Sequence, residues 1–313
     1  MTAPHWIDAQ QLRRRIPPSR ARELLREALR AGFDPAGDPA RTSTPAGDGE
    51  ILLMPSHIGS AAGVKVVGVA PGNAQRGLPR IQGWYVLMDG ETLTPTTLLD
   101  GQALTSLRTP AVSAVGLEVL APEVVETALI IGSGPQALGH AEALLALREV
   151  GRFVVAGRDA ERAAACARQI EALGTPAHGV RADYPRDARD LETVARQAQV
   201  IMCTTSSGEP VIASEWVADG TCVVAVGSHS PARRELDAAL MGRSLVVVED
   251  VDAALREAGD VVLAIDDGAL TRADLRTLSD VANGRVQRPT DRPSVIKTVG
   301  MSWEDLVIAA AAR

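Results

Sequence analysis

The sequence predicts an α/β protein made of a doubly wound parallel-sheet domain and an α+β domain. Hairpin-like strands are predicted between residues 51 and 99, whereas strand and helix patterns alternate after about residue 120. Hairpins form antiparallel sheets, and alternating apolar strands and helices form parallel sheets that are covered on both faces. The length of 313 residues also exceeds one typical hydrophobic core.

The N-terminal part combines a helix with several strands. Apolar residues at helical spacing predict a helix over 19–31, and a turn-rich stretch follows at 32–50. Strand-like apolar runs come next, at 51–54, 64–69 and 81–88. Asp89-Gly90 is a typical hairpin turn, so 91–99 is predicted to return as the partner strand.

From Leu104 onward the pattern changes. Helical spacing covers 103–120, and buried strands are then predicted at 127–131, 152–156, 200–204, 221–226 and 244–248. Helical patterns lie between them, at 136–148 and 160–173 among others, and an apolar helix is predicted over 303–311. This alternation predicts the parallel sheet.

Composition and charge narrow the classes of partner. The formal net charge is −7, so the surface repels phosphate backbones and we expect no nucleic-acid partner. Neither a signal-peptide pattern nor an apolar stretch of about 20 residues is visible, so we expect a cytoplasmic protein with no membrane partner. The five histidines have no metal-ligand spacing, so we expect no metal.

A glycine-rich loop follows the first strand of the alternating region. It consists of Gly132, Ser133, Gly134, Pro135, Gln136 and Ala137. Gly132 permits a tight turn, Gly134 lets the backbone approach a pyrophosphate, and Ala137 lets the next helix pack against the strand. The helix N-terminus then offers N–H groups to phosphates. The strand before the loop and the helix after it predict a Rossmann-type dinucleotide-binding domain.

The residues after the second strand select between the two nicotinamide cofactors. An NAD enzyme usually has Asp or Glu there to bind the ribose 2′-hydroxyl, but this sequence has Gly157 followed by Arg158. A 2′-phosphate needs a cation and no competing carboxylate, so NADP(H) is favoured. NAD(H) stays possible, because Asp159 could either cap the next helix or turn toward the ribose.

An ordered series of short motifs resembles the ornithine cyclodeaminase/mu-crystallin family. The series runs through Met54-Pro55, Val64–Val67, Pro71–Asn73, Gly77–Pro79, Leu104–Ala111, the glycine-rich loop, Thr204–Ser206, Val226–Ser228, Arg234–Asp237 and Lys297–Gly300. The resemblance implies a Rossmann domain over 111–294. It also implies a substrate-binding and dimerisation domain built from 1–110 and 295–313, and a homodimer. Members of the family handle an imine or amine next to a carboxylate.

Three basic residues match family positions that hold the substrate carboxylate: Arg41, Lys65 and Arg108. Lys65 interrupts an apolar strand, which indicates either a site or a solvated face. Arg108 lies in a mostly uncharged segment, where a guanidinium group suits a carboxylate or an interdomain salt bridge. Arg41 lies in a polar loop and could equally be solvated.

The clearest departure from the family pattern is His229. Ornithine cyclodeaminases have a Gly-Gly-Asp motif whose Asp is thought to act on the δ-amino group, but this sequence reads Gly227-Ser228-His229. A histidine binds a second ammonium group poorly, so ornithine cyclisation is disfavoured. Histidine titrates near neutral pH and could donate a proton to an imine nitrogen, or it could be a loop residue without that role.

Other cofactor contacts follow from the resemblance and from strand ends. Thr109 matches a family residue near the cofactor phosphates, and Thr205 and Ser206 follow a strand at the cofactor edge. Val226 and Gly227 end the next strand and are expected close to the nicotinamide. Lys297 either reaches toward the cofactor or lies on the surface.

Taken together, these features favour an NAD(P)H-dependent reductase of small cyclic imino acids, namely Δ1-pyrroline-2-carboxylate and Δ1-piperideine-2-carboxylate. Lys65 and His229 are the candidate catalytic residues. The alternatives are ornithine cyclodeaminase, an amino acid dehydrogenase or amine-coupling synthase, and a non-catalytic NADPH-dependent binding protein like mu-crystallin.

Overall fold

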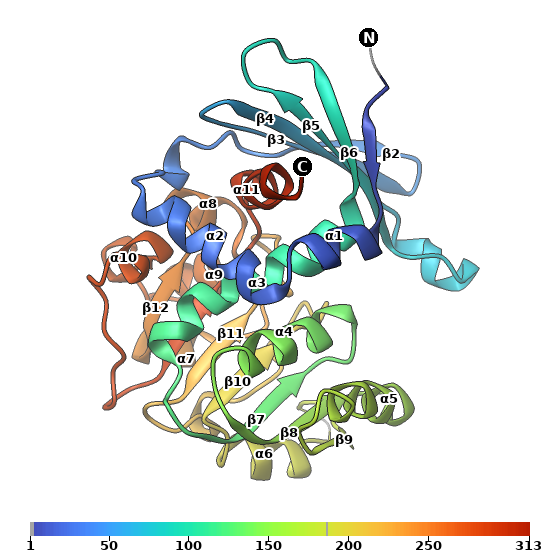
Figure 1. Ribbon diagram of the computed structural model, residues 1–313. Coiled ribbons are helices and arrows are strands. Elements are labelled where there is room, and N and C mark those ends of the chain that lie inside the picture. The colour runs from blue at the N-terminus through green and yellow to red at the C-terminus, as the bar shows by residue number, and fades with distance from the viewer. Residues whose placement is uncertain (1–2, 186) are drawn as a thin grey trace. The chain divides into compact units, whose positions relative to one another are not determined.

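The structure is a computed structural model that describes residues 3–185 and 187–313. The chain divides into two compact units, unit 1 (1–111 and 300–313) and unit 2 (112–299). The first boundary falls inside helix α3 (Gly101–Leu120), which is shown in Figure 1. Residues 295–299, expected in the tail of the substrate domain, belong to unit 2. The reason is that strand β14 (Ser294–Lys297) pairs within the parallel sheet.

Unit 1 is built on a six-stranded sheet in the order β1-β6-β5-β4-β3-β2. Its strands are β1 (His5–Ile7), β2 (Thr42–Ala46), β3 (Gly49–Ile58), β4 (Ala61–Val69), β5 (Ile81–Asp89) and β6 (Pro95–Asp100). Strands β2 to β6 form successive antiparallel pairs, as the hairpin patterns predict, and β1 joins β6 in parallel. Alternation in the strands gives this sheet one buried face and one exposed face.

Helices cover one face of this sheet. They are α1 (Ala9–Arg15), α2 (Pro18–Arg30) and α11 (Ser302–Ala312). Two 3-10 turns lie in other connections of unit 1: η1 (Pro35–Gly37) between α2 and β2, and η2 (Pro71–Arg76) between β4 and β5. α11 packs on β3, β4 and β5, and α2 packs on α11. The other face leaves large apolar side chains exposed, and Trp6 stacks on Trp84 with 4.7 Å between ring centroids. An exposed apolar face of this kind is typical of an interface.

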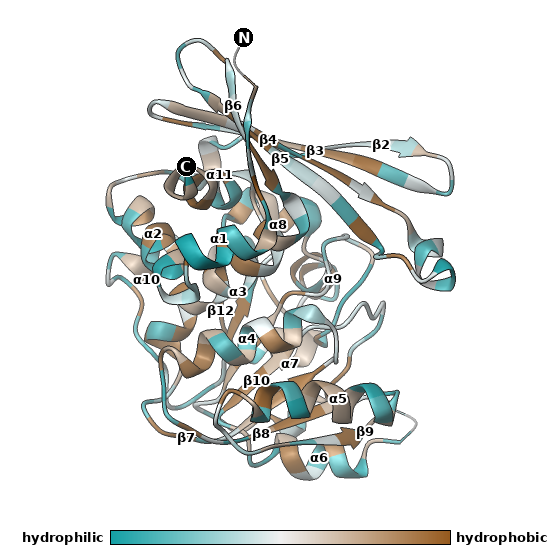
Figure 2. Cartoon of the chain, turned by 45° about the vertical axis from the view of Figure 1, so that its right-hand side comes forward, coloured by the Kyte–Doolittle hydropathy of each residue, from teal (hydrophilic) through white to brown (hydrophobic). Residues whose placement is uncertain are grey.

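Unit 2 is built on an eight-stranded, wholly parallel sheet in the order β13-β12-β14-β11-β10-β7-β8-β9. Besides β14, its strands are β7 (Val125–Ile131), β8 (Val150–Gly157), β9 (Ala177–Arg181), β10 (Val200–Cys203), β11 (Cys222–Ala225), β12 (Leu245–Val248) and β13 (Arg276–Thr277). β7, β8 and β10 are coloured mainly hydrophobic in Figure 2, because both faces of the sheet are covered. The direction in which successive strands are added reverses between β7 and β10. Doubly wound sheets bind their ligands at such a switch point.

The helices of unit 2 connect these strands. They are α4 (Pro135–Leu145), α5 (Ala160–Glu171), α6 (Arg189–Ala195), α7 (Ala238–Arg243), α8 (Val251–Glu257), α9 (Gly259–Asp266) and α10 (Leu278–Ala282), with 3-10 turns η3 (Ser214–Trp216) and η4 (Arg272–Asp274). Cys166, Cys203 and Cys222 are free and buried. Among the described residues, no helix combines the length and apolar character that crossing a bilayer requires.

One expected strand begins later in the structure than its sequence pattern predicts. The partner strand expected at 91–99 begins only at Pro95, because the turn after Asp89 is longer than two residues. The Asp89 carboxylate accepts hydrogen bonds from the backbone of Glu91 and Thr92, and Leu93 has a positive φ of 54°. These contacts stabilise an extended turn that a two-residue hairpin rule does not describe.

Candidate functional site: a dinucleotide edge and a buried cation cluster

The carboxyl end of β7 carries the glycine-rich loop. Gly132 has a φ of +118°, and a Cβ on it would lie 2.6 Å from Thr204 Oγ1, at the end of β10. Gly134 is the N-cap of α4 without a side-chain cap, and Pro135 takes the first helical position. A Cβ on Gly134 would meet no atom within 4 Å, and Ala137, in the first turn of α4, is fully buried. The loop therefore keeps backbone N–H groups and open space where a pyrophosphate needs them.

The end of β8 lies against this loop. A Cβ on Gly157 would be 3.7 Å from Ser133 Oγ, so the end of β8 lies beside the glycine-rich loop, and the exposed Arg158 is the next residue along the chain. The Asp159 carboxylate accepts hydrogen bonds from the backbone N–H groups of Glu161 and Arg162, and so caps α5. Asp159 therefore caps helix α5 in the structure and is not turned toward a ribose.

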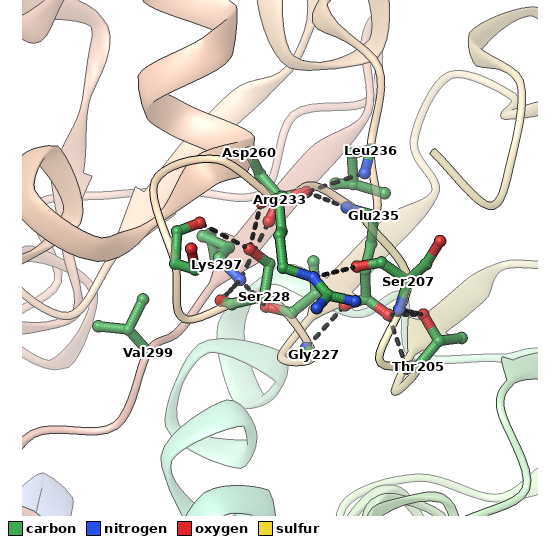
Figure 3. Close-up of polar contacts among 12 residues, drawn as sticks. Thr205, Ser207, Gly227, Ser228, Arg233, Glu235, Leu236, Asp260, Lys297 and Val299 are labelled. Carbon is green, nitrogen blue, oxygen red and sulfur yellow. Dashed lines mark hydrogen bonds and ion pairs between the residues drawn. The ribbon is translucent and has the colours of Figure 1, made fainter. Parts of the chain in front are cut away.

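A buried glutamate joins the ends of β10 and β11, as Figure 3 shows. Glu235 Oε1 accepts hydrogen bonds from the backbone N–H and the hydroxyl of Thr205, both at 2.7 Å. Glu235 Oε2 accepts from the Gly227 N–H, also at 2.7 Å. A Cβ on Gly227 would lie 1.8 Å from the Thr205 carbonyl oxygen, so only glycine fits there. Thr205 and Gly227, both expected to contact the cofactor, are thus held together.

Two more buried charges support Glu235. Asp260 Oδ1 accepts from the backbone N–H groups of Glu235 and Leu236 at 2.7 and 2.8 Å. Lys297 Nζ lies 3.1 Å from Asp260 Oδ2 and donates to the Ser228 carbonyl at 2.6 Å. Burial raises the pKa of Glu235 to about 7, with a further contribution from Asp260 that Lys297 and the Thr205 hydrogen bonds partly offset.

The pairing of these three buried charges is not predicted by the sequence patterns. Lys297 is 1% exposed, so the surface position is wrong, and its ammonium group lies in the core of unit 2. In the sequence, Glu235 belongs to the Arg234–Asp237 motif of the family series, but neither Glu235 nor Asp260 is assigned a role. A signal was present, because Asp260 directly precedes the apolar run 261–265 and begins an otherwise buried helix face.

The remaining cofactor-edge residues are more exposed. Val226 is half-buried at the end of β11, and Ser206 and His229 are exposed. The residue before His229 is firmly held, because the Ser228 hydroxyl donates to the Arg233 carbonyl and its own carbonyl accepts from Lys297. A catalytic role for His229 stays a prediction.

In unit 1, the three expected carboxylate-binding residues lie together around the start of α11. Lys65 Nζ lies 2.7 Å from Asp305 Oδ2, and Arg108 contacts the same carboxylate through Nε at 3.5 Å. Arg108 Nη1 also lies 3.1 Å from Glu304 Oε2. Arg41 Nη2 donates to the Gly300 carbonyl at 3.1 Å. Residues separated by more than 250 positions in sequence therefore form one cluster.

The structure decides between the alternatives for Lys65. Its side chain is 2% exposed, on the helix-covered face of the sheet, so the solvated face is wrong. Burial lowers the pKa of Lys65 to about 8, with Asp305 acting in the opposite direction. Lys65 Nζ also donates to Thr105 Oγ1 at 3.3 Å. An ammonium group with such a pKa can hold an anion or release a proton near neutral pH.

Gly300 is fitted to this cluster. Its φ is +81°, and a Cβ would lie 2.2 Å from Arg108 Nη1.

Thr109 follows Arg108 in α3 and is buried. The apolar pattern of the tail predicts only a helix and gives no role to Glu304 and Asp305, although two adjacent carboxylates in such a helix indicate buried ion pairs.

A comparison of the sequence with protein families shows which family this chain belongs to. The model of the ornithine cyclodeaminase/mu-crystallin family matches residues 22–313, nearly the whole chain. The chain belongs to this family. The resemblance inferred from the ordered motifs is confirmed, and so is the fold class.

Individual members of the family are similar over most of their length. A Δ1-pyrroline-2-carboxylate reductase of Bacillus cereus is 36% identical over 87% of this chain and 83% of its own. A Δ1-pyrroline-2-carboxylate/Δ1-piperideine-2-carboxylate reductase of Azospirillum brasilense is 36% identical over 88% and 84%. The solved structure of the Thermococcus litoralis Δ1-pyrroline-2-carboxylate reductase with NADH and L-proline aligns with a TM-score of 0.90. It is 26% identical, and the alignment covers 98% of this chain and 96% of that one.

Proposed function

We propose that this protein is an NAD(P)H-dependent oxidoreductase that reduces small cyclic imino acids. The substrates are Δ1-pyrroline-2-carboxylate and Δ1-piperideine-2-carboxylate, and the products are proline and pipecolate. The observation that carries the proposal is the convergence of Arg41, Lys65 and Arg108 on the segment Gly300–Asp305. Two relatives of 36% identity that carry these reductase names support it.

The cation cluster binds the substrate carboxylate. Lys65 offers a point charge and Arg108 a planar fork, and together they fix both oxygens. Glu304 and Asp305 hold these cations in place before substrate arrives. Because both cations are buried, their attraction for an anion is screened less than at a surface.

Reduction of a C=N bond requires hydride at carbon and a proton at nitrogen. The reduced nicotinamide supplies the hydride when it is bound. In this chain, Gly132–Ala137 would hold the pyrophosphate, and Thr205 and Gly227 would border the nicotinamide. His229 or water supplies the proton to the imine nitrogen.

The cofactor is a nicotinamide dinucleotide, and we propose a preference for NADPH. Arg158 follows the phosphate-binding edge and offers a cation to the 2′-phosphate. The adjacent acid, Asp159, is engaged by two backbone N–H groups of α5. Asp159 therefore repels a 2′-phosphate less strongly than a free carboxylate would. It also does not bind a ribose hydroxyl in this position.

We also propose a cytoplasmic homodimer. The exposed face of the unit 1 sheet supports the dimer, because Ile51, Leu53, Val66 and Trp84 all lie on it with about two fifths or more of their surface exposed. A two-fold axis would bring this face against its own copy, the commonest arrangement among homo-oligomers.

The test is a spectrophotometric panel with the purified protein. Both imines should oxidise NADPH faster than NADH at equal concentrations, and Arg108→Gln should raise the KM for the imine at least tenfold. Arg272→Gln is the matched control, because its ion pair with Asp252 is 60% exposed on the arginine side. No oxidation with either imine contradicts the proposal. Proline formation from ornithine and NAD⁺, without net absorbance change, would instead indicate a cyclodeaminase.

A further inference from the structure

The buried charges Glu235, Asp260 and Lys297 lie at the edge of the sheet where the cofactor is expected, yet they take no part in the proposed chemistry. Asp260 is fully buried, as is Glu235, and Lys297 is 1% exposed. Placing three charges there is unfavourable unless each is paired and hydrogen-bonded. Replacing buried ion pairs with apolar side chains of similar volume is often neutral or stabilising, so stability alone does not explain this group.

What the group does hold is the backbone of two loops. Glu235 takes three donors: the N–H and hydroxyl of Thr205 and the N–H of Gly227. These donors come from the loops that follow β10 and β11. Ionised carboxylates accept such hydrogen bonds about twice as strongly as neutral groups do. One side chain therefore sets the separation of the two loops.

The other two charges orient the glutamate and extend its reach. Asp260 fixes the backbone of Glu235 and Leu236 from α9, and Lys297 from β14 neutralises Asp260. Lys297 also donates to the carbonyls of Ala225 and Ser228. The segment from Gly227 to Ser228, directly before His229, is thus held from both sides, as the dashed lines in Figure 3 show.

We propose that Glu235, supported by Asp260 and Lys297, is a positioning residue that fixes the Thr205 and Gly227 loops for nicotinamide binding and hydride transfer. This inference rests on the proposed reductase function for its turnover readout. It also predicts a cofactor-binding readout that needs no imine at all.

The main test is Glu235→Gln, which keeps the shape but replaces one acceptor oxygen with an amide NH₂ that opposes the Gly227 N–H. We expect about tenfold weaker NADPH binding, measured by the fluorescence of the bound cofactor, and about tenfold lower kcat with an unchanged KM for the imine. Glu192→Gln is the matched control, because its contact with Arg196 is exposed. A folded Glu235→Gln protein with the wild-type NADPH affinity and kcat overturns the inference.

A milder pair covers the case in which Glu235→Gln does not fold. Thr205→Val removes only the hydroxyl that donates to Glu235, whereas Thr205→Ser keeps it. Thr205→Val should weaken NADPH binding several-fold, and Thr205→Ser should not. Equal affinities for the two variants overturn the inference. If the wild type reduces no imine, the proposed function fails, while the NADPH affinities of the variants still decide the role of Glu235.

The wild-type pH profile gives an independent signature. Glu235 faces Asp260, Lys297 and Thr205, and its pKa is raised to about 7 by burial first and Asp260 second. Protonation below that pH removes an acceptor from the loop donors, so kcat should fall toward acid. A proton-donating His229 would produce the opposite slope. Glu235→Gln should abolish the acid limb, and an acid limb that persists unchanged in this variant contradicts the inference.

Discussion

Replacing Asp305 with asparagine should move the pH dependence of substrate capture, because Asp305 stabilises the cationic form of Lys65. The two groups are 2.7 Å apart, and their side chains are 2% and 0% exposed. Asparagine keeps the shape of the side chain and removes its charge. In this variant, burial and the neighbouring Arg108 cation still disfavour the ammonium form of Lys65.

The size of the effect follows from burial. Removing one partner of a buried ion pair costs about 3–5 kcal/mol. One pKa unit corresponds to about 1.4 kcal/mol, so even the lower figure amounts to about two units in the pKa of Lys65. The pKa of Lys65 is about 8 in the wild type. In Asp305→Asn, Lys65 should therefore be largely uncharged at pH 7.5, and capture of a carboxylate should weaken.

The assay is kcat/KM for the imine from about pH 5.5 to 9.5, since this ratio reports groups of the free enzyme. In the wild type it should fall above about pH 8, and in Asp305→Asn the fall should begin about two units lower. Asp267→Asn is the matched control. Its pair with Arg234 is 2.8 Å long but the aspartate is 51% exposed, so no change is expected. A folded Asp305→Asn enzyme whose basic limb stays at the wild-type pH would refute the reasoning.

Further predictions concern the cofactor edge and the exposed face of the unit 1 sheet. Arg158→Ala should raise the KM for NADPH by about 10- to 100-fold, because one charged hydrogen bond is lost, and should leave the KM for NADH unchanged. Equal effects on the KM values of both cofactors would exclude a contact between Arg158 and the 2′-phosphate. Gly227→Ala should lower both the melting temperature and NADPH affinity, because a Cβ would lie 1.8 Å from a backbone oxygen. Gly134→Ala has open space and should lower affinity alone, so a drop in its melting temperature would count against this geometry. Trp84→Glu should give monomers by light scattering, whereas Val124→Glu, at an apolar position in unit 2 that is even more exposed, should not; a Trp84→Glu dimer contradicts the proposed interface.

Many of the strands and helices can be predicted from local sequence patterns. The apolar strands of unit 2, such as 127–131 and 200–204, are near-continuous runs that only a doubly covered sheet explains. β14 was missed, because Ser294 to Lys297 is a four-residue run that ends in a lysine. Its place between β11 and β12 depends on hydrogen bonds to strands about 50 and 70 residues earlier. Short strands that are far from their partners in sequence leave no periodic signal.

The sequence by itself determined the glycine-rich loop, because its function depends on backbone conformation and on neighbours within six residues. It also indicated which cations suit a carboxylate, through residue type and family resemblance. Only the tertiary structure decided that Lys65 is buried and paired with Asp305, 240 positions away. It likewise decided that Lys297 lies against Asp260 and below the loops held by Glu235. Burial and charge pairing arise from packing between distant segments, and these two quantities set the pKa values on which the proposed chemistry depends.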